Sequence, residues 1–300
     1  MRKNIFFENE LKIYDFVGKF TSIENMDKLK SEILELKDTG KLNDWIYENY
    51  LQFDFDVSEG YKSIMISAMK LPVVKVTVKK NKKIKEIMIP SAYYSGGKVD
   101  AYNNSIDEMF NKYSVKYKPV HLPCKLLVAR TGLGSYGKNN IAYIDEFGSY
   151  FRIRAFLTDI EMDEDNWCEV TQTDQCASCH ICEKNCPNNI INDKSYLIDA
   201  GQCITYPNEI KGVFPKWIKS EWHNALIGCM KCQLDCPNNL KFKNDMKVIS
   251  HLTKENALDI FTNNHYEDLK DDTKLKIKEI EFSDAYEVFK RNFEAVYHNL

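Results

Sequence analysis

Apolar residues recur at two spacings along this chain, and the pattern changes near residue 60. Between Leu11 and Phe20 they lie three residues apart, which predicts a helix. A second helix is expected from Asn25, which can serve as its N-cap, to a stop at Gly40. The first 50 residues are therefore expected to be helical scaffolding.

Strand patterns begin at residue 61. The apolar run within Tyr61–Leu71 favours a buried strand, and Val73–Val78 with Ile84–Ile89 favours a hairpin. The turn between these two runs, Lys79–Lys83, is the most basic patch of the sequence. We interpret it as a solvated hairpin tip rather than a phosphate contact, because charges at such tips discourage edge pairing.

Loops and short elements alternate after residue 90. Tyr93–Lys98 is expected to be a flexible aromatic loop, and Pro123 suits the first turn of a helix over Cys124–Arg130. The glycines of Gly132–Asn139 should end that helix, and because they follow a helix they do not form a dinucleotide fingerprint. Further expected elements are a helix near Ile106–Tyr113, a strand at Val115–Val120, and tail helices at Asn256–Phe261 and Phe282–Tyr297.

The composition is that of an ordinary globular protein, with 44% hydrophobic and 28% charged residues. No apolar run approaches the ~20 residues of a membrane span, so no membrane association is expected. A formal net charge of -3 indicates no general attraction to nucleic acid, and any RNA contact would need a local basic patch. The charged start, Met1–Asn4, is unlike a signal peptide, which predicts a cytoplasmic protein with reduced cysteines.

The cysteines carry the strongest chemical signal. Two runs, Cys176-x2-Cys179-x2-Cys182-x3-Cys186-Pro187 and Cys229-x2-Cys232-x3-Cys236-Pro237, have Cys203 between them. The first run has the bacterial two-cluster ferredoxin spacing, in which three thiolates bind one cubane and the fourth binds the other. This predicts two 4Fe-4S clusters, the first bound by Cys176, Cys179, Cys182 and Cys236 and the second by Cys186, Cys203, Cys229 and Cys232.

Several of these residues have alternative roles. Paired C-x2-C motifs also make tetrahedral zinc sites, although the ferredoxin spacing suits a cubane better. Cys124 and Cys168 lie outside both runs and are expected to pack as small apolar residues. His180 and His223 are not expected to be ligands, because eight cysteines complete both sets.

Three stretches in the middle of the chain resemble the central signature of the epoxyqueuosine reductase family. They are Ala129–Asn139 (ARTGLGSYGKN), Phe147–Phe151 (FGSYF) and Leu157–Ile160 (LTDI), and the family carries this signature directly before a double-cluster unit. In the cluster region, Asp199–Tyr206 and Ile227–Pro237 resemble the family's way of supplying its second cluster. The resemblance extends over roughly residues 61–240.

Length and cysteine positions predict an α+β protein in three parts. These are a mixed α/β domain at 1–165, a ferredoxin-like double 4Fe-4S domain at 166–240 and a short helical extension at 241–300. The resemblance implies that the first domain binds a corrinoid and the substrate. It further implies a cytoplasmic oxidoreductase of queuosine biosynthesis and tRNA processing. In such a protein a base-off cobalamin beside one cluster removes the epoxide oxygen of epoxyqueuosine in tRNA, with electrons from a ferredoxin or flavodoxin.

The resemblance also suggests site residues. Those placed around the corrinoid, besides Cys203, are Lys138, Ser149, Tyr150, Tyr206, Met230 and Lys231, each of which has a plainer alternative as a surface, turn or packing residue. The family's proton-donating aspartate aligns with His121 after a shift of one residue. Histidine can donate a proton near neutral pH, so His121 is the candidate acid, and a non-catalytic histidine is the alternative.

Three functions stay open from the sequence. The first is an epoxyqueuosine reductase-like enzyme, with tRNA as a partner. The second is a reductase of the same architecture with another small substrate, which the missing aspartate favours. The third is a non-enzymatic electron carrier, ranked last because a carrier needs no large pocketed domain. The sequence does not define an oligomeric state.

Overall fold

The computed structural model of the protein describes residues 3–42, 44–51, 53, 60–80, 82–193 and 197–299. The chain forms two compact units, each built from three separate stretches. Unit 1 comprises Met1–Lys70, Gly97–His180 and Ile191–Gly201, and unit 2 comprises Leu71–Gly96, Ile181–Ile190 and Gln202–Leu300. Because neither unit is one continuous stretch, this division does not test the linear boundaries after residues 165 and 240, which stay a prediction.

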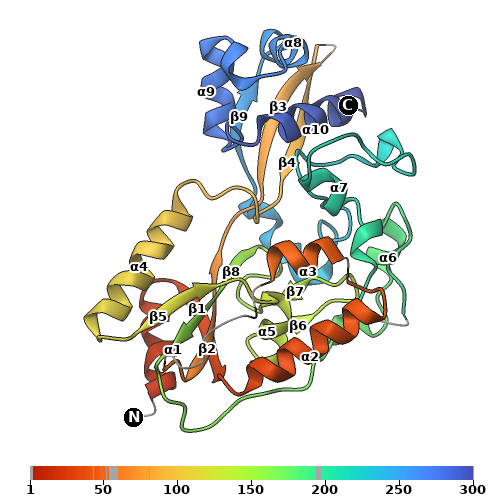
Figure 1. Cartoon of the computed structure of the whole chain (residues 1–300). Coiled ribbons are helices and arrows are strands. Elements are labelled where there is room, and N and C mark those ends of the chain that lie inside the picture. Colours follow the sequence, from red (N-terminus) through yellow and green to blue (C-terminus); the bar gives the residue numbers. More distant parts are fainter. Residues whose placement is uncertain are drawn as a thin grey trace. The chain divides into compact units, whose positions relative to one another are not determined.

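Unit 1 contains a four-stranded antiparallel sheet of order β1-β2-β8-β5, and a short ladder of β6 with β7 (Figure 1). Its elements are α1 (Lys3–Ile13), β1 (Phe16–Ser22), α2 (Asn25–Asp38), α3 (Asp44–Tyr50), β2 (Ser63–Lys70), α4 (Lys98–Lys112), β5 (Tyr117–Val120), α5 (Cys124–Arg130), β6 (Ser135–Tyr136), β7 (Ala142–Tyr143) and β8 (Phe151–Thr158).

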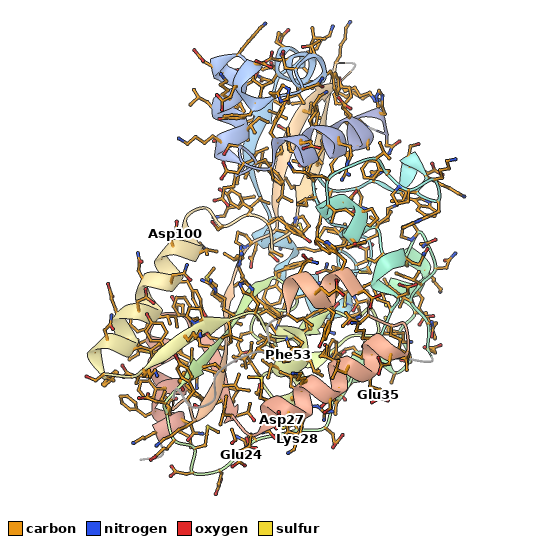
Figure 2. All side chains as sticks on the ribbon, in the orientation of Figure 1. Glu24, Asp27, Lys28, Glu35, Phe53 and Asp100 are labelled. Atoms are coloured by element: carbon orange, nitrogen blue, oxygen red, sulfur yellow. The ribbon has the colours of Figure 1, made fainter. Side chains whose placement is uncertain are left out.

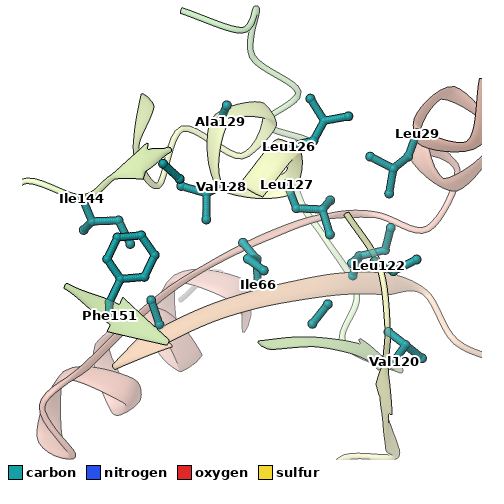
Figure 3. Close-up of a cluster of buried hydrophobic side chains, with 14 of the residues drawn as sticks. Leu29, Ile66, Val120, Leu122, Leu126, Leu127, Val128, Ala129, Ile144 and Phe151 are labelled. Atoms are coloured by element: carbon teal, nitrogen blue, oxygen red, sulfur yellow. The ribbon is translucent and has the colours of Figure 1, made fainter. Parts of the chain in front are cut away.

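The core of unit 1 lies where α2 and α5 pack on this sheet (Figure 3). Leu29 of α2, Leu127 of α5 and Ile66 of β2 are all fully buried there. Burial of each such side chain stabilises the fold by about 2 kcal/mol. Strand β2 is buried along almost its whole length, which confirms the buried strand predicted from its apolar run.

Helix α2 is amphipathic, with one buried apolar face and one exposed polar face. Leu29 and Ile33 are buried, whereas Asp27, Lys28 and Glu35 are exposed (Figure 2). Because apolar residues three or four apart share one face of a helix, this single stripe attaches α2 to the sheet.

Two expectations for the first 50 residues are wrong. Helix α1 ends at Ile13, while Val17 and Phe20 lie in β1, which pairs with β2 over its full length. Pairing with a neighbouring strand outweighs a weak helical period of only three repeats. Asn25 is the first residue of α2 rather than its N-cap, and its side chain donates to Asp165 (2.6 Å).

Unit 2 is organised around a three-stranded sheet of order β4-β3-β9. The predicted hairpin is confirmed, with β3 antiparallel to β4; Asn81 of its turn lies outside the described residues. The elements of unit 2 are β3 (Val74–Lys80), β4 (Lys83–Ile89), α6 (Ile181–Asn185), α7 (Thr205–Glu209), β9 (Lys247–Leu252), α8 (Lys254–Thr262), α9 (Asp271–Glu279) and α10 (Tyr286–Asn299).

The core of unit 2 is formed by the sheet and the three C-terminal helices. Val76 of β3, Ile260 of α8, Ile277 of α9 and Phe289 of α10 are fully buried in it. Strand β9 pairs in parallel with β3 and was not expected from the sequence. The predicted tail helices are confirmed, and their apolar faces belong to the core of unit 2.

The mixture of helices and strands confirms the predicted α+β class. Among the described residues, none of the helices combines the length and apolar character that crossing a membrane requires.

Candidate iron-sulfur site

Unit 2 gathers the four cysteines of the predicted second cluster. They come from three places in the chain: Cys186 directly follows α6, Cys203 precedes α7, and Cys229 and Cys232 follow a buried stretch at 225–228. Burial raises the pKa of the Cys232 thiol well above its usual range, and the thiols around it, those of Cys229, Cys203, Cys182 and Cys186, raise the pKa further. The structure thus gathers the thiols of Cys186, Cys203 and Cys229 around Cys232, and Cys182 of the predicted first set lies close to the same group.

Hydrogen-bond donors point at two of these sulfurs. The Asn224 amide nitrogen lies 3.2 Å from Cys229 Sγ, and its oxygen accepts the N–H of Met230 (2.9 Å). Burial raises the pKa of Cys229 and of Cys203, and donors from Asn224 and Thr205 respectively lower it only in part. Buried thiols with donors aimed at sulfur fit a bound cluster, because iron replaces the proton and the donors stabilise the thiolate.

Sequence reasoning missed Asn224. An asparagine five residues before a cysteine has no recognisable spacing, so only the folded turn shows that its amide reaches Cys229 Sγ.

The cysteines of the predicted first cluster are divided between the units. Cys176 and Cys179 belong to unit 1, and Cys182 and Cys236 to unit 2. Within unit 1, Cys176 ends a 3-10 helix (Asp174–Cys176), and its Sγ faces the backbone N–H of Lys138 at 3.4 Å.

The glycine-rich signature shapes the segment that supports Cys176. Gly132 has φ +68°, a conformation that favours glycine, and it ends α5 as predicted. A Cβ on Gly134 would lie 2.2 Å from the carbonyl oxygen of Tyr143, so a side chain there would collide with backbone. Gly132 therefore allows the turn after α5, and Gly134 allows β6 to pack closely against β7.

Lys138 is held beside Cys176 and Cys179 by hydrogen bonds and an ion pair. Its side chain is only 4% exposed, pairs with Asp193 and donates to the carbonyl of Cys179 (3.1 Å). Together with its backbone N–H toward Cys176, this places a buried positive charge next to the cysteine-bearing segment. A contact between Lys138 and a corrinoid stays a prediction.

Two cavities, of about 680 and 630 Å³, lie within unit 1. The larger borders the glycine turn, and the smaller lies between α2, α3 and the start of α5. Ser149 and Tyr150 are buried, and neither they nor Lys138 line these cavities. The role of Ser149 and Tyr150 toward a corrinoid stays a prediction, as it does for Lys138.

The other three corrinoid candidates lie in unit 2, close in sequence to the second cysteine group. Tyr206 is in α7 and its N–H donates to the carbonyl of Cys203 (3.1 Å). Met230 is fully buried, whereas Lys231 is partly exposed, and its N–H and charge lower the pKa of the Cys229 thiol. Their role toward a corrinoid is likewise untested.

His121 is exposed between β5 and α5, while its neighbours Val120 and Leu122 are buried. The alternation of a strand end turns the imidazole outward from the unit 1 core. Its catalytic role stays a prediction.

The two outlying cysteines differ. The Cys124 thiol is enclosed, and burial raises its pKa to about 12, in keeping with a packing role. Cys168 is exposed, so the expectation that it packs is wrong. Its backbone N–H donates to the Arg130 carbonyl (2.6 Å), directly before the glycine turn.

Comparison with known proteins defines the class of the cluster region. Residues 175–239 match the family model of the 4Fe-4S double cluster binding domain, which confirms that this region is of the double-cluster type.

The curated proteins that align with this chain include epoxyqueuosine reductases, which confirms the resemblance predicted from the sequence motifs. The chain is 36% identical over 114 residues to that of Aliivibrio fischeri and 34% identical over 114 residues to that of Escherichia coli. Each alignment covers 38% of this chain and 29% of the relative, so the aligned part is less than a third of either of these two relatives.

Solved structures of the same kind share the fold. Epoxyqueuosine reductase from Streptococcus thermophilus superposes with a TM-score of 0.68 and 16% identity, covering 100% of this chain and 82% of that one. The enzyme from Bacillus subtilis gives 0.68 and 20% identity, covering 98% and 82%. At these identities the similarity establishes the fold.

Proposed function

We propose that this protein is an iron-sulfur reductase that removes the epoxide oxygen of epoxyqueuosine in tRNA. The observation that carries the proposal is the gathering of Cys186, Cys203 and Cys229 around the buried Cys232 thiol in unit 2, within a region of the double-cluster type. The relatives that align here are epoxyqueuosine reductases. The activity stays a proposal because the aligned part is a fraction of those relatives.

In this proposal the two 4Fe-4S clusters form the electron path. Cys186, Cys203, Cys229 and Cys232 hold the second cluster, and the remaining four of the eight hold the first. Cubane potentials reach several hundred millivolts below zero, tuned by hydrogen bonds to sulfur such as the one from Asn224. A low-potential ferredoxin or flavodoxin in the cytoplasm is the proposed electron donor.

The proposed further cofactor is cobalamin, which supplies the reducing centre that acts on the epoxide. Its support is the family resemblance, together with Tyr206, Met230 and Lys231 in the segments that carry the second cysteine group. Anaerobic protein supplied with cobalamin should show a corrinoid absorption spectrum after gel filtration. Absence of bound corrinoid in cluster-replete protein would contradict this part of the proposal.

His121 is the proposed proton donor. The Bacillus subtilis enzyme has been solved with a catalytic loop, named for an aspartate, swung out of the active site. In this chain the His121 side chain is exposed between β5 and α5, where a substrate could reach it without displacing core residues. His121→Phe should lower turnover about 10²–10⁴-fold while leaving both clusters intact. Unchanged turnover would remove the histidine from the mechanism.

The proposed macromolecular partner is tRNA. An epoxyqueuosine reductase has been solved with an epoxyqueuosine-modified tRNA stem loop. Unit 2 carries two groups of exposed lysines, one at the hairpin tip (Lys79, Lys82, Lys83) and one in the loop 211–222 (Lys211, Lys216, Lys219). The loop also holds Trp217 and Trp222, and basic residues interleaved with aromatic ones suit unpaired nucleotides.

Position favours the loop over the hairpin tip. The carbonyl of Trp222 accepts from Asn224 (3.0 Å), which also donates to Cys229 Sγ, so the loop ends beside the second cysteine group. Replacing the three loop lysines by glutamate should weaken stem-loop binding at least tenfold at about 0.1 M salt. The same triple change at the hairpin tip is the matched control. Equal losses would indicate a general charge effect rather than a defined contact.

Turnover decides between the candidate functions. Cluster- and cobalamin-replete protein should convert an epoxyqueuosine-containing stem loop under a low-potential reductant. Replete protein without turnover would instead support the second candidate, a reductase for another small substrate, which histidine in place of the expected aspartate favours. Protein that exchanges electrons but binds neither corrinoid nor RNA would support an electron carrier.

A further inference from the structure

The link between Cys203 and Cys229 runs through residues 204–228, and its closure is not explained by the cysteine spacing. Two ligands of one cluster must lie within a few ångströms of each other, so a link of this length has to be held shut by other groups. The holding groups are found on α10, far beyond the last cysteine in sequence.

The two ends of the link are joined by an asparagine. Asn208, in α7, donates to the carbonyl of Gly228 (2.7 Å), which directly precedes Cys229. Asn292 of α10 then donates to the carbonyls of Asn208 (2.8 Å) and Leu226 (2.9 Å). Both asparagines are fully buried, so these bonds form where water does not compete.

Arg291 holds the loop that leaves the Cys203 end. Its guanidinium donates to the carbonyls of Pro207 (2.8 Å), Ile210 (2.9 Å) and Gly212 (2.6 Å). The ring of Phe214 lies 4.1 Å from the same guanidinium. The planar fork of donors in arginine can serve three carbonyls at once, which the point charge of lysine does less well.

The two side chains of α10 act together. Arg291 donates to Asn292 Oδ1 from Nε (3.1 Å) and from Nη2 (2.8 Å). The amide of Asn292 therefore has its oxygen used by Arg291 and its nitrogen used by the link. Neighbouring Phe289 and Phe293 are buried in the core of unit 2, which anchors the helix that carries the pair.

We propose that Arg291 and Asn292 are positioning residues for the second cluster, setting Cys203 against Cys229 through Asn208 and Gly228. This inference rests on the ligand set of the proposed function. Losing one partner in a buried polar network is costly because the other is left unpaired away from water, and here the bonds join both ligand-bearing ends to one helix. The C-terminal helix thus acts on the metal centre as well as on the core.

The test compares Asn292→Leu and Arg291→Lys with Lys290→Met as matched control. Lys290 is the preceding residue of α10, its side chain is 12% exposed, and it donates to the carbonyl of Phe261 (3.0 Å) rather than to the link. All variants are reconstituted anaerobically. Iron content, the electron paramagnetic resonance signals of the two clusters and their midpoint potentials are measured, with the first cluster as internal standard.

Asn292→Leu should lower occupancy of the second cluster relative to the first by about tenfold, because two buried carbonyls lose their donor. Arg291→Lys should retain the second cluster with a shifted midpoint potential and altered signal. Lys290→Met should leave both clusters unchanged.

Two results would overturn the inference. One is that Asn292→Leu and Arg291→Lys both keep the wild-type ratio of cluster occupancies and the wild-type midpoint potentials. The other is the same disturbance in Lys290→Met, which would indicate a role limited to helix stability. None of these measurements uses epoxyqueuosine, so absent turnover in wild type with two normal clusters would refute the proposed substrate alone.

Discussion

The two groups of cysteines differ in what holds them. In unit 2, Cys186, Cys203, Cys229 and Cys232 converge from three chain segments and are fastened by side-chain amides from α7, α10 and Asn224. In unit 1, Cys176 Sγ faces the backbone N–H of Lys138, which lies in a tight glycine-containing turn, and the hydroxyl of Thr173 three residues before it.

This difference predicts two kinds of sensitivity. The second site depends on contacts between residues far apart in sequence, which single side-chain deletions can break. The first pair lies against a glycine turn that has no room for a larger side chain, so added volume in that turn is the change expected to disturb it.

The largest expected effect is the loss of a whole cluster in Cys203→Ala. No other cysteine in the link can replace the thiolate, so the second cluster should be lost and about half of the eight iron atoms should remain. Iron and acid-labile sulfide per chain, measured in anaerobic protein, provide the check. Equal loss of both clusters would show that the two groups are not independent, and zinc without sulfide would refute the cubanes.

Gly134→Ala should instead disturb the cysteines of unit 1. The added methyl would meet the Tyr143 carbonyl, so β6 must move, at a cost of about 2–3 kcal/mol in the free energy of unfolding. Denaturant melting gives this value, and Ser135→Ala is the neighbouring control. In Gly134→Ala we expect the first cluster to be lost at a lower denaturant concentration than the second. Preferential loss of the second would contradict a local dependence of Cys176 on this turn.

Acid should weaken unit 2 through His223. Burial, followed by the charge of Arg291, lowers the pKa of His223 to about 4. The unfolded chain takes up a proton below its ordinary pKa of about 6.5, whereas the folded protein does not. Stability from this group is therefore fully present above pH 6.5 and is lost as the pH falls from about 6.5 to 4.

At pH 5 this loss amounts to about 2 kcal/mol relative to pH 7, and His223→Phe should remove it. Phenylalanine keeps the ring contact with Phe214 (4.4 Å between centroids). Denaturant midpoints of both proteins at pH 7 and pH 5 give the comparison. The same pH dependence in both would show that other groups dominate acid unfolding.

The smallest expected effect is electronic. Asn224→Ala removes the N–H donor to Cys229 Sγ, which should make the potential of the second cluster more negative by tens of millivolts. For a one-electron couple, 59 mV corresponds to about 1.4 kcal/mol, the scale of one hydrogen bond to a charged group. Redox titration should leave the first cluster unchanged. A shift in both potentials would mean that the amide acts on the whole region.

Much of the local structure follows from sequence alone. The hairpin of β3 and β4, the helix over Cys124–Arg130 and its glycine stop match their predicted positions. These elements depend on neighbours in the chain, namely alternation, proline at a helix start and a residue that accepts positive φ. The double-cluster type of residues 175–239 was likewise readable, because cubane ligands have a characteristic spacing.

Only the tertiary structure decided the rest. Strand β1 replaced a predicted helix because β2 offered a partner edge, and β9 joined the sheet through β3 rather than through its own pattern. Asn208, Asn292 and Arg291 have no signature in sequence, since an amide or guanidinium that closes a distant loop obeys no period. Their partners are backbone carbonyls up to 84 residues away, and such bonds are defined only once the core of unit 2 has placed α10 beside the link.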